Sequence, residues 1–189
     1  GTAELSEIAD SGHGAVTDLA FSPDSRWLAW AEPVTVHGAR SRIRLRETSG
    51  SGAAITDVTD GRFHDHSPSF TPDGKFLAFL SERSFDPVYD THGFDLGFPT
   101  STKPFLIALA AGTNSPFGPS AHVVEAPAAG SAESDDPQDV PEDAPATAVD
   151  LERLAERIIA VPVPQGSYTK LRAAEGALLW LAADVYGVT

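Results

Sequence analysis

Two apolar segments of strand length, each preceded by a short polar turn, dominate the first half of the chain. In SFTPDGKFLAF, residues 69–79, the apolar run after the turn does not alternate with polar residues. A strand buried on both faces has this pattern, whereas a strand with one wet face has a polar residue at every other position. Pro72 fixes φ at about −65° and Gly74 tolerates a positive φ, so both residues favour a turn. The stretch predicts a β-hairpin whose second strand lies inside a stack of sheets.

The same pattern occurs 49 residues earlier, in AFSPDSRWLAW at residues 20–30. Ser25 there takes the place of Gly74 and is the weakest match. A fainter third copy, LRAAEGALLWLA at residues 171–182, keeps a glycine at Gly176 but has no proline. Repeats of about 40–50 residues built from β-type units are typical of β-propellers.

Each of the first two repeats has four segments with strand character, separated by turn signals. We expect strands at residues 16–22, 27–32, 42–47 and 54–58, and again at residues 66–71, 75–82, 103–110 and 157–163. Four antiparallel strands per repeat describe a propeller blade. The expected fold is therefore all-β, a partial ring from a six- or seven-bladed propeller. Its divisions are one blade at residues 1–62, a second at 63–166, and the start of a further blade at 167–189.

An acidic segment rich in alanine and proline interrupts the second blade. Residues 121–149 contain seven carboxylates and no Lys or Arg. Such a composition cannot bury enough apolar surface to offset the entropy of ordering, so it predicts a disordered loop, at about residues 119–149, inserted ahead of the outermost strand of the blade. An acidic docking site for a partner is the alternative.

The overall composition narrows the classes of function. The chain has a net charge of −14 and contains neither Cys nor Met. The missing Cys excludes a disulfide framework, a thiol nucleophile and a thiolate metal site. The acidity argues against a nucleic-acid partner, and no run approaches the length of about 18 apolar residues that a membrane span needs. We expect a soluble chain whose Gly1 is a processed end or the edge of an excised piece.

The segment HDHS, residues 64–67, is the best metal candidate in the sequence. His64 and His66 are two positions apart on an expected strand and so share a face, and Asp65 could add a carboxylate. A metal site needs three or four converging ligands, however, and only two are placed. We therefore favour a structural role for these polar residues, at the loop that enters the first strand of the blade.

Other candidate residues give no stronger signal for chemistry. The group Asp86, Asp90, His92 and Asp95 fits no calcium-loop spacing, and we interpret it as part of an ordered connection between blades. Trp27 and Trp30 lie on a central strand and are expected in the core. The chain has no Gly-x-Ser-x-Gly elbow, no phosphate-binding loop and no His-Glu-x-x-His motif. No catalytic, cofactor-binding or metal-binding residue is assigned.

Two longer segments, residues 70–109 and 149–181, resemble the seven-bladed propeller of the tricorn protease family. The members of this family are large cytosolic serine peptidases of archaea and some actinobacteria. The specific parts are Phe85-Asp86-Pro87-Val88-Tyr89-Asp90, Phe94-Asp95-Leu96, and Asp150-Leu151-Glu152 followed by Arg157-Ile158-Ile159. The resemblance covers nearly the whole chain. The acidic insert departs from it and fits a bacterial, actinobacterial type of relative.

This resemblance implies a cytoplasmic serine peptidase that degrades oligopeptides downstream of the proteasome, without a cofactor. The family's catalytic residues lie in C-terminal domains that are not matched here, so this segment is expected to serve as a substrate channel or gate and as a scaffold. The implied partners are oligopeptide substrates, the remaining domains of the parent chain and further copies in a hexamer. The alternative is a partner-binding propeller of the TolB or prolyl-oligopeptidase kind, which shares the Pro-Asp-Gly hairpin.

Overall fold

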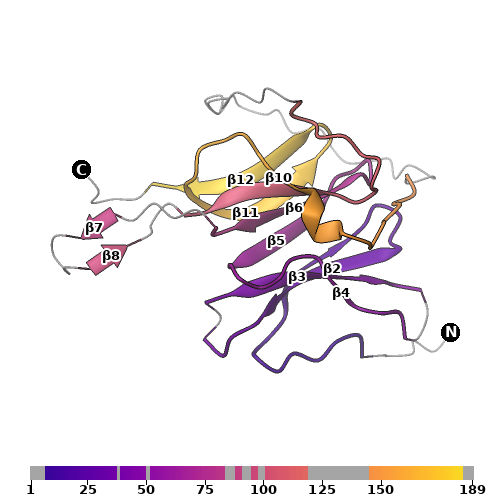
Figure 1. The fold of residues 1–189 in the computed structure, drawn as a ribbon, viewed down its shortest axis with the longest axis horizontal. Coiled ribbons are helices and arrows are strands. Elements are labelled where there is room, and N and C mark those ends of the chain that lie inside the picture. Colours follow the sequence, from indigo (N-terminus) through magenta and orange to yellow (C-terminus); the bar gives the residue numbers. More distant parts are fainter. Residues whose placement is uncertain are drawn as a thin grey trace, which may run out of the picture.

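The computed structural model describes residues 7–37, 39–49, 52–83, 88–90, 95–97, 101–118 and 145–184. Within these ranges, strands account for nearly all of the regular structure, together with one short 3₁₀ helix, η1 (Leu154–Arg157). Figure 1 shows two sheets and a hairpin stacked as successive layers. No helix in the described part of the chain is long and apolar enough to cross a membrane.

The first two layers are four-stranded antiparallel sheets whose strands follow one another in chain order. The first contains β1 (Thr17–Phe21), β2 (Trp27–Pro33), β3 (Ser41–Glu47) and β4 (Thr56–Asp57). The second contains β5 (Asp65–Phe70), β6 (Phe76–Ser81), β9 (Lys103–Ala108) and β10 (Ile158–Ala160). The predicted all-β propeller architecture is confirmed.

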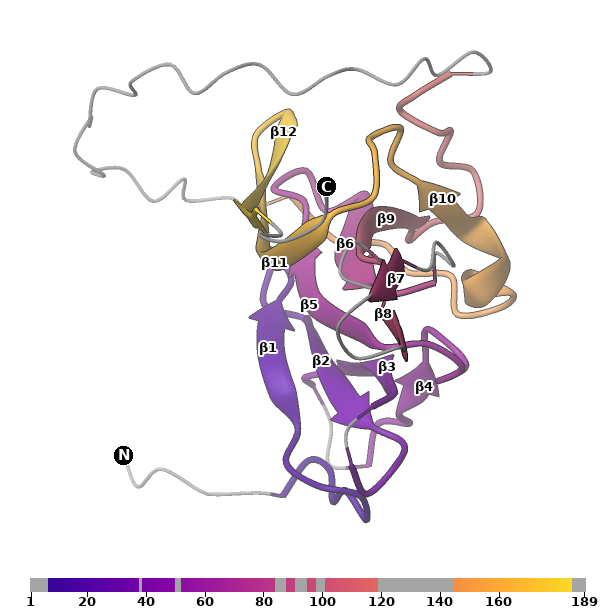
Figure 2. The ribbon, with the colours of Figure 1, turned by 90° about the vertical axis from the view of Figure 1, so that its left-hand side faces the viewer.

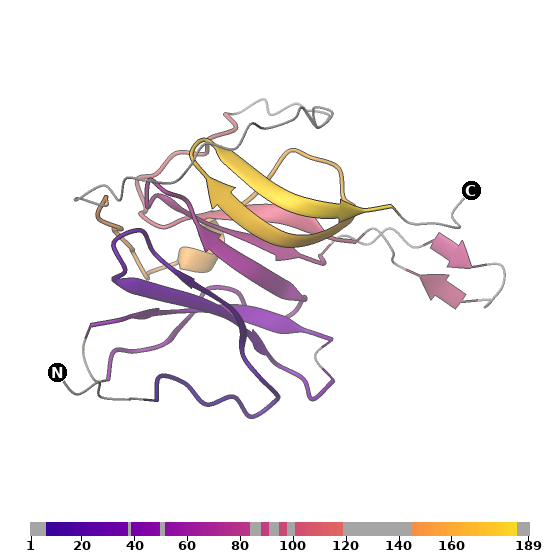
Figure 3. The same ribbon diagram turned by 180° about the vertical axis from the view of Figure 1, so that it is seen from behind.

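The third layer is a hairpin of β11 (Ser167–Ala174) and β12 (Ala177–Ala183), which Figure 3 shows lying over the second sheet. Its two-residue loop, Glu175-Gly176, has a positive φ at the glycine, at 65°. The faint third copy of the sequence pattern is thus a real hairpin. Most of the acidic segment, residues 119–144, lies outside the described residues, and in the sequence it falls between β9 and β10.

The expectation that the segment after Ser84 connects two blades is wrong. The strands β7 (Val88–Asp90) and β8 (Asp95–Gly97) pair with each other as a small hairpin. Because β6 and β9 pair directly on either side of it, this hairpin is an excursion within the second sheet and does not connect two blades.

The core lies between the layers, as the unbroken apolar runs predict. Every residue of β6 is buried, and its side chains alternate between two clusters. Leu77 and Phe79 pack toward the first sheet, whereas Ala78 and Leu80 pack toward the β11–β12 hairpin. β6 therefore has no wet face.

Both tryptophans of β2 occupy interior positions, as expected. Trp30 is only 2% exposed. Trp27 is half-buried and packs against the cluster between the first two sheets. Both indoles therefore contribute to packing.

The innermost strand of each of the three layers contains a β-bulge. Asp18 in β1, Ser67 in β5 and Lys170 in β11 each have a positive φ, and the strand register shifts at each of them. Bulges bend a strand and increase its twist. The same irregularity therefore recurs at the same place in each blade.

The bulges lie where these strands meet one another. The carboxylate of Asp18 accepts a hydrogen bond of 2.9 Å from the backbone N–H of Ser67, and the hydroxyl of Ser69 accepts one of 3.0 Å from the N–H of Ala173. Figure 2 shows β1, β5 and β11 in succession along one side of the molecule, with β4 and β10 on the other. This arrangement is that of an arc of a propeller, in which the inner strands of successive blades contact one another.

Candidate functional site

The bulge at Ser67 determines which side chains gather at the start of β5. On the turn side of the bulge, Phe70 pairs with Leu77, and continuing this register would place His64 opposite Arg83. Beyond the bulge, Asp65 pairs with Ser81, and the N–H of Glu82 donates to the carbonyl of His64 at 3.1 Å. The shift of one residue therefore puts Glu82 directly across from His64.

His64, His66 and Glu82 form one cluster on the resulting face. The two imidazoles are stacked, with ring centroids 4.8 Å apart and an angle of 30° between the planes. His64 Nδ1 lies 3.1 Å from Glu82 Oε1, and His66 Nδ1 lies 3.1 Å from the hydroxyl of Ser67. The ligand atoms of all three residues lie within 4.8 Å of one another.

The close contacts shift the pKa values of the three groups in different directions. The hydrogen bond to Glu82 raises the pKa of His64, and the same bond lowers the pKa of Glu82. Burial and then the neighbouring His64 lower the pKa of His66. Proximity to a like charge and loss of hydration both disfavour a second imidazolium. At neutral pH His66 is therefore a neutral imidazole with a lone pair to offer.

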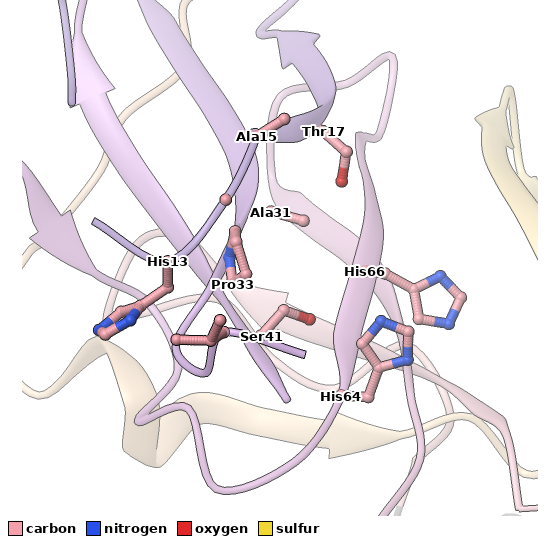
Figure 4. Close-up of a pocket in the computed structure, with 10 residues that line it drawn as sticks. His13, Ala15, Thr17, Ala31, Pro33, Ser41, His64 and His66 are labelled. Atoms are coloured by element: carbon pink, nitrogen blue, oxygen red, sulfur yellow. The ribbon is translucent and has the colours of Figure 1, made fainter. Parts of the chain in front are cut away.

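A hollow of about 310 Å³ adjoins this cluster. Figure 4 shows its lining, with His64 and His66 side by side and His13 on the opposite side. Thr17, Ala31, Pro33 and Ser41 supply much of the wall between them. The two histidines are thus reachable from a space large enough for a small ligand.

Asp65 does not join the histidines, contrary to the suggestion from the sequence. It is completely buried, and its carboxylate accepts hydrogen bonds from Ser81 and, at 3.0 Å and 3.2 Å, from Arg83. The guanidinium of Arg83 also lies over the rings of Phe63 and Phe105. Asp65 is therefore committed to a structural ion pair on the other face of the strand.

The remaining candidates, Asp86, Asp90, His92 and Asp95, do not form a site among the residues that the structure describes. Asp86 and His92 lie outside the described residues. Asp90 and Asp95 are the residues that pair at the end of the β7–β8 hairpin, which is described at the level of the backbone. Because this hairpin lies between two paired strands of one sheet, these residues do not connect two blades, and only their structural rather than chemical role stays a prediction.

The strand order, the repeated inner bulges and the buried central strands define the class of this molecule as a β-propeller. Comparison with known proteins identifies the family within that class. The chain matches the model of the tricorn protease second beta propeller domain over residues 1–189. It belongs to this family.

Individual relatives agree with that assignment. The chain is 44% identical to tricorn protease homolog 1 of Streptomyces coelicolor over 98% of its own length, and 42% identical to putative tricorn protease homolog 2 of the same organism over 96%. It covers 17% and 15% of those two proteins. A crystal structure of the tricorn protease matches with a TM-score of 0.71 at 26% identity, over 95% of this chain and 16% of the other. The predicted resemblance to a bacterial tricorn protease is confirmed.

Proposed function

We infer that this chain forms part of the substrate channel or gate, and part of the scaffold, of a tricorn-type serine peptidase. The peptidase degrades oligopeptides downstream of the proteasome, in the cytoplasm. Its catalytic residues lie in other domains of the parent chain, which assembles as a homo-oligomer. The blade divisions at residues 62/63 and 166/167 belong to the same proposal.

The observation that carries this proposal is the contact between successive inner strands. In a propeller the blades surround a central channel, so the strands nearest the axis are the ones a passing chain meets. β1, β5 and β11 contact one another in order, and each presents a bulge at that position. A peptide moving along the axis would pass the exposed side chains of Asp18 and Lys170.

A blocking experiment tests the channel. The chain has no Cys, so an introduced thiol is the single cysteine of this segment, and the unsubstituted parent treated with the same label accounts for cysteines elsewhere. In the parent peptidase, Lys170→Cys carries a bulky maleimide at the inner strand β11. The matched control is Asn114→Cys, an exposed residue in the connection after β9, away from the inner strands.

We expect the label on Lys170→Cys to slow hydrolysis of long oligopeptides several-fold while hydrolysis of a dipeptide-sized fluorogenic substrate stays unchanged. The same label on Asn114→Cys should affect neither substrate. Equal rates for labelled and unlabelled Lys170→Cys on every substrate would show that peptides do not pass this strand.

A further inference from the structure

The cluster of His64, His66 and Glu82 has the composition of a metal site. Two imidazoles and one carboxylate are a donor set that suits zinc and similar divalent transition metals, whereas calcium and magnesium prefer oxygen ligands alone. The structure supplies the third converging ligand that the sequence does not place, because Glu82 directly follows β6 and lies across from the two histidines at the start of β5.

The geometry is close to that of a zinc site. Ligand atoms at the corners of a tetrahedron, about 2.0–2.1 Å from the metal, lie about 3.3–3.4 Å from one another. His64 Nδ1 and Glu82 Oε1 are already 3.1 Å apart, and the ligand atoms of the whole cluster lie within 4.8 Å. Small side-chain rotations therefore bring the three ligands onto one ion without movement of the paired strands.

The surroundings of His66 resemble the outer shell of a metal site. A histidine ligand usually uses its second ring nitrogen in a hydrogen bond that fixes the orientation of the ring. His66 Nδ1 contacts the hydroxyl of Ser67, and the carboxylate of Asp18 lies 3.5 Å from the same hydroxyl. This chain of contacts holds the ring and leaves Nε2 of His66 as the ligand atom.

The cluster is also accessible. The side chains of His64 and Glu82 are 35% and 41% exposed, and both histidines border the hollow of about 310 Å³. Three protein ligands with an open side leave a fourth position for water or for an oxygen of a small ligand, as in zinc sites that are not purely structural.

We propose that His64, His66 and Glu82 bind one divalent transition-metal ion, with zinc as the best fit, at the rim of the inner strand of the second blade. The ion joins β5 to β6 beyond the bulge at Ser67 and presents its free coordination position to the hollow lined by His13 and Thr17.

The test is a metal titration of the purified protein without a histidine tag. After removal of metal with a chelator, zinc chloride is titrated in competition with a chromophoric indicator, and cobalt chloride is added separately to record its visible absorption. We compare the unchanged protein with His66→Ala, Glu82→Gln and His13→Ala. The last is a matched control, because His13 lines the same hollow and lies outside the cluster.

We expect saturation at one zinc ion per chain, and a cobalt spectrum of tetrahedral or five-coordinate intensity. His66→Ala and Glu82→Gln should each weaken zinc binding at least about tenfold, while His13→Ala should bind as the unchanged protein does. Circular dichroism establishes that each variant is folded. Binding that does not saturate, or that is equally strong in His66→Ala and Glu82→Gln, would overturn the proposal.

A second measurement does not depend on the folding of any variant. In the unchanged protein, zinc should shift the imidazole NMR signals of His64 and His66 and leave that of His13 in place. Signals of His64 and His66 that stay unperturbed at saturating zinc would also overturn the proposal.

Discussion

Ser25 and Gly74 occupy the same position in two equivalent turns, and both have left-handed backbone, with φ of 57° and 68°. The turns are otherwise closely matched. The hydroxyl of Ser22 donates to the carboxylate of Asp24, and the hydroxyl of Thr71 donates to that of Asp73, both at a distance of 2.6 Å. Each hydroxyl also accepts a hydrogen bond from the backbone N–H five residues later. Ser25 therefore takes the conformation that the glycine of the other repeat prefers, at a cost in backbone strain.

Replacing Ser25 with glycine should remove that strain. We expect Ser25→Gly to raise the free energy of unfolding by about 0.5–1 kcal/mol, the difference between a left-handed non-glycine residue and the entropic cost of glycine. The reciprocal variant Gly74→Ala should be destabilised, since its Cβ would lie 2.8 Å from Thr147 Oγ1 as well as at positive φ. Chemical denaturation measures both, and a loss of stability in Ser25→Gly would contradict the argument.

At the level of single residues, the sequence predicts part of the candidate site. Alternation along a strand correctly places His64 and His66 on one face. It cannot place Glu82, because a regular hairpin would bring Arg83 opposite His64, and only the bulge at Ser67 moves Glu82 there. A serine is an unusual residue at positive φ, so nothing in its identity marks the bulge. The equivalent position in β1 is Asp18, which tolerates this backbone better.

The elements themselves follow the sequence closely, for a physical reason. Strands such as β2 and β6 are buried on both faces, and turns with characteristic turn residues bound them. The apolar run and the turn residues therefore predict the same strand limits. The interpretation of Asp86, Asp90, His92 and Asp95 as part of a connection between blades is wrong, because a local pattern does not reveal which strands pair around an excursion. The pairing of β6 with β9 depends on contacts between distant residues.

One ion network, centred on the buried carboxylate of Glu32, connects three strands of the first sheet. Glu32 in β2 pairs with Arg42 and Arg44 in β3 at 3.0 Å and 2.8 Å, and both arginines also pair with Asp57 in β4. The carboxylate of Glu32 is nearly inaccessible, with its side chain 6% exposed. Burial alone would raise the pKa of Glu32, but the hydrogen bonds from Arg44 and Arg42 outweigh it and hold the pKa below its ordinary value.

This network should contribute to stability in a pH-dependent way. Because the folded-state pKa of Glu32 is lowered, its contribution is complete above the ordinary pKa of 4.5 and is lost as the pH falls through the folded-state value. Glu32→Gln should lower the free energy of unfolding by about 3 kcal/mol at pH 7, because it leaves two partly buried guanidinium groups with Asp57 alone. The difference from the unchanged protein should shrink in acid.

Thermal or chemical unfolding between pH 3 and pH 7 measures this dependence. Glu47→Gln is the matched control, since Glu47 pairs with Arg26, whose side chain is 57% exposed. Exposed pairs of this kind contribute at most about 1 kcal/mol. A destabilisation of Glu32→Gln that is the same at pH 3 and pH 7 would show that its carboxylate charge is not what matters.

The described layers form an arc with an open face at each end. The second sheet is covered on both sides, but the outer face of the first sheet exposes Leu19 and Phe21, at 62% and 59%. At the other end the β11–β12 hairpin exposes Leu179 and Leu181, each at 59%. In a complete propeller a neighbouring blade covers such a face, just as β6 is covered here on both sides.

Exposed apolar faces drive association, so the isolated chain should self-associate in solution. The double variant Phe21→Ser, Leu179→Lys removes one apolar side chain from each end and should sediment as a smaller species at the same concentration. Val36→Ser is the control, because Val36 is 76% exposed but lies in the loop after β2 and on neither sheet face. Sedimentation velocity over a range of concentrations measures the effect. A stable monomer for the unchanged chain would mean that the two end faces do not need a neighbouring blade, and the open-arc interpretation would then be wrong.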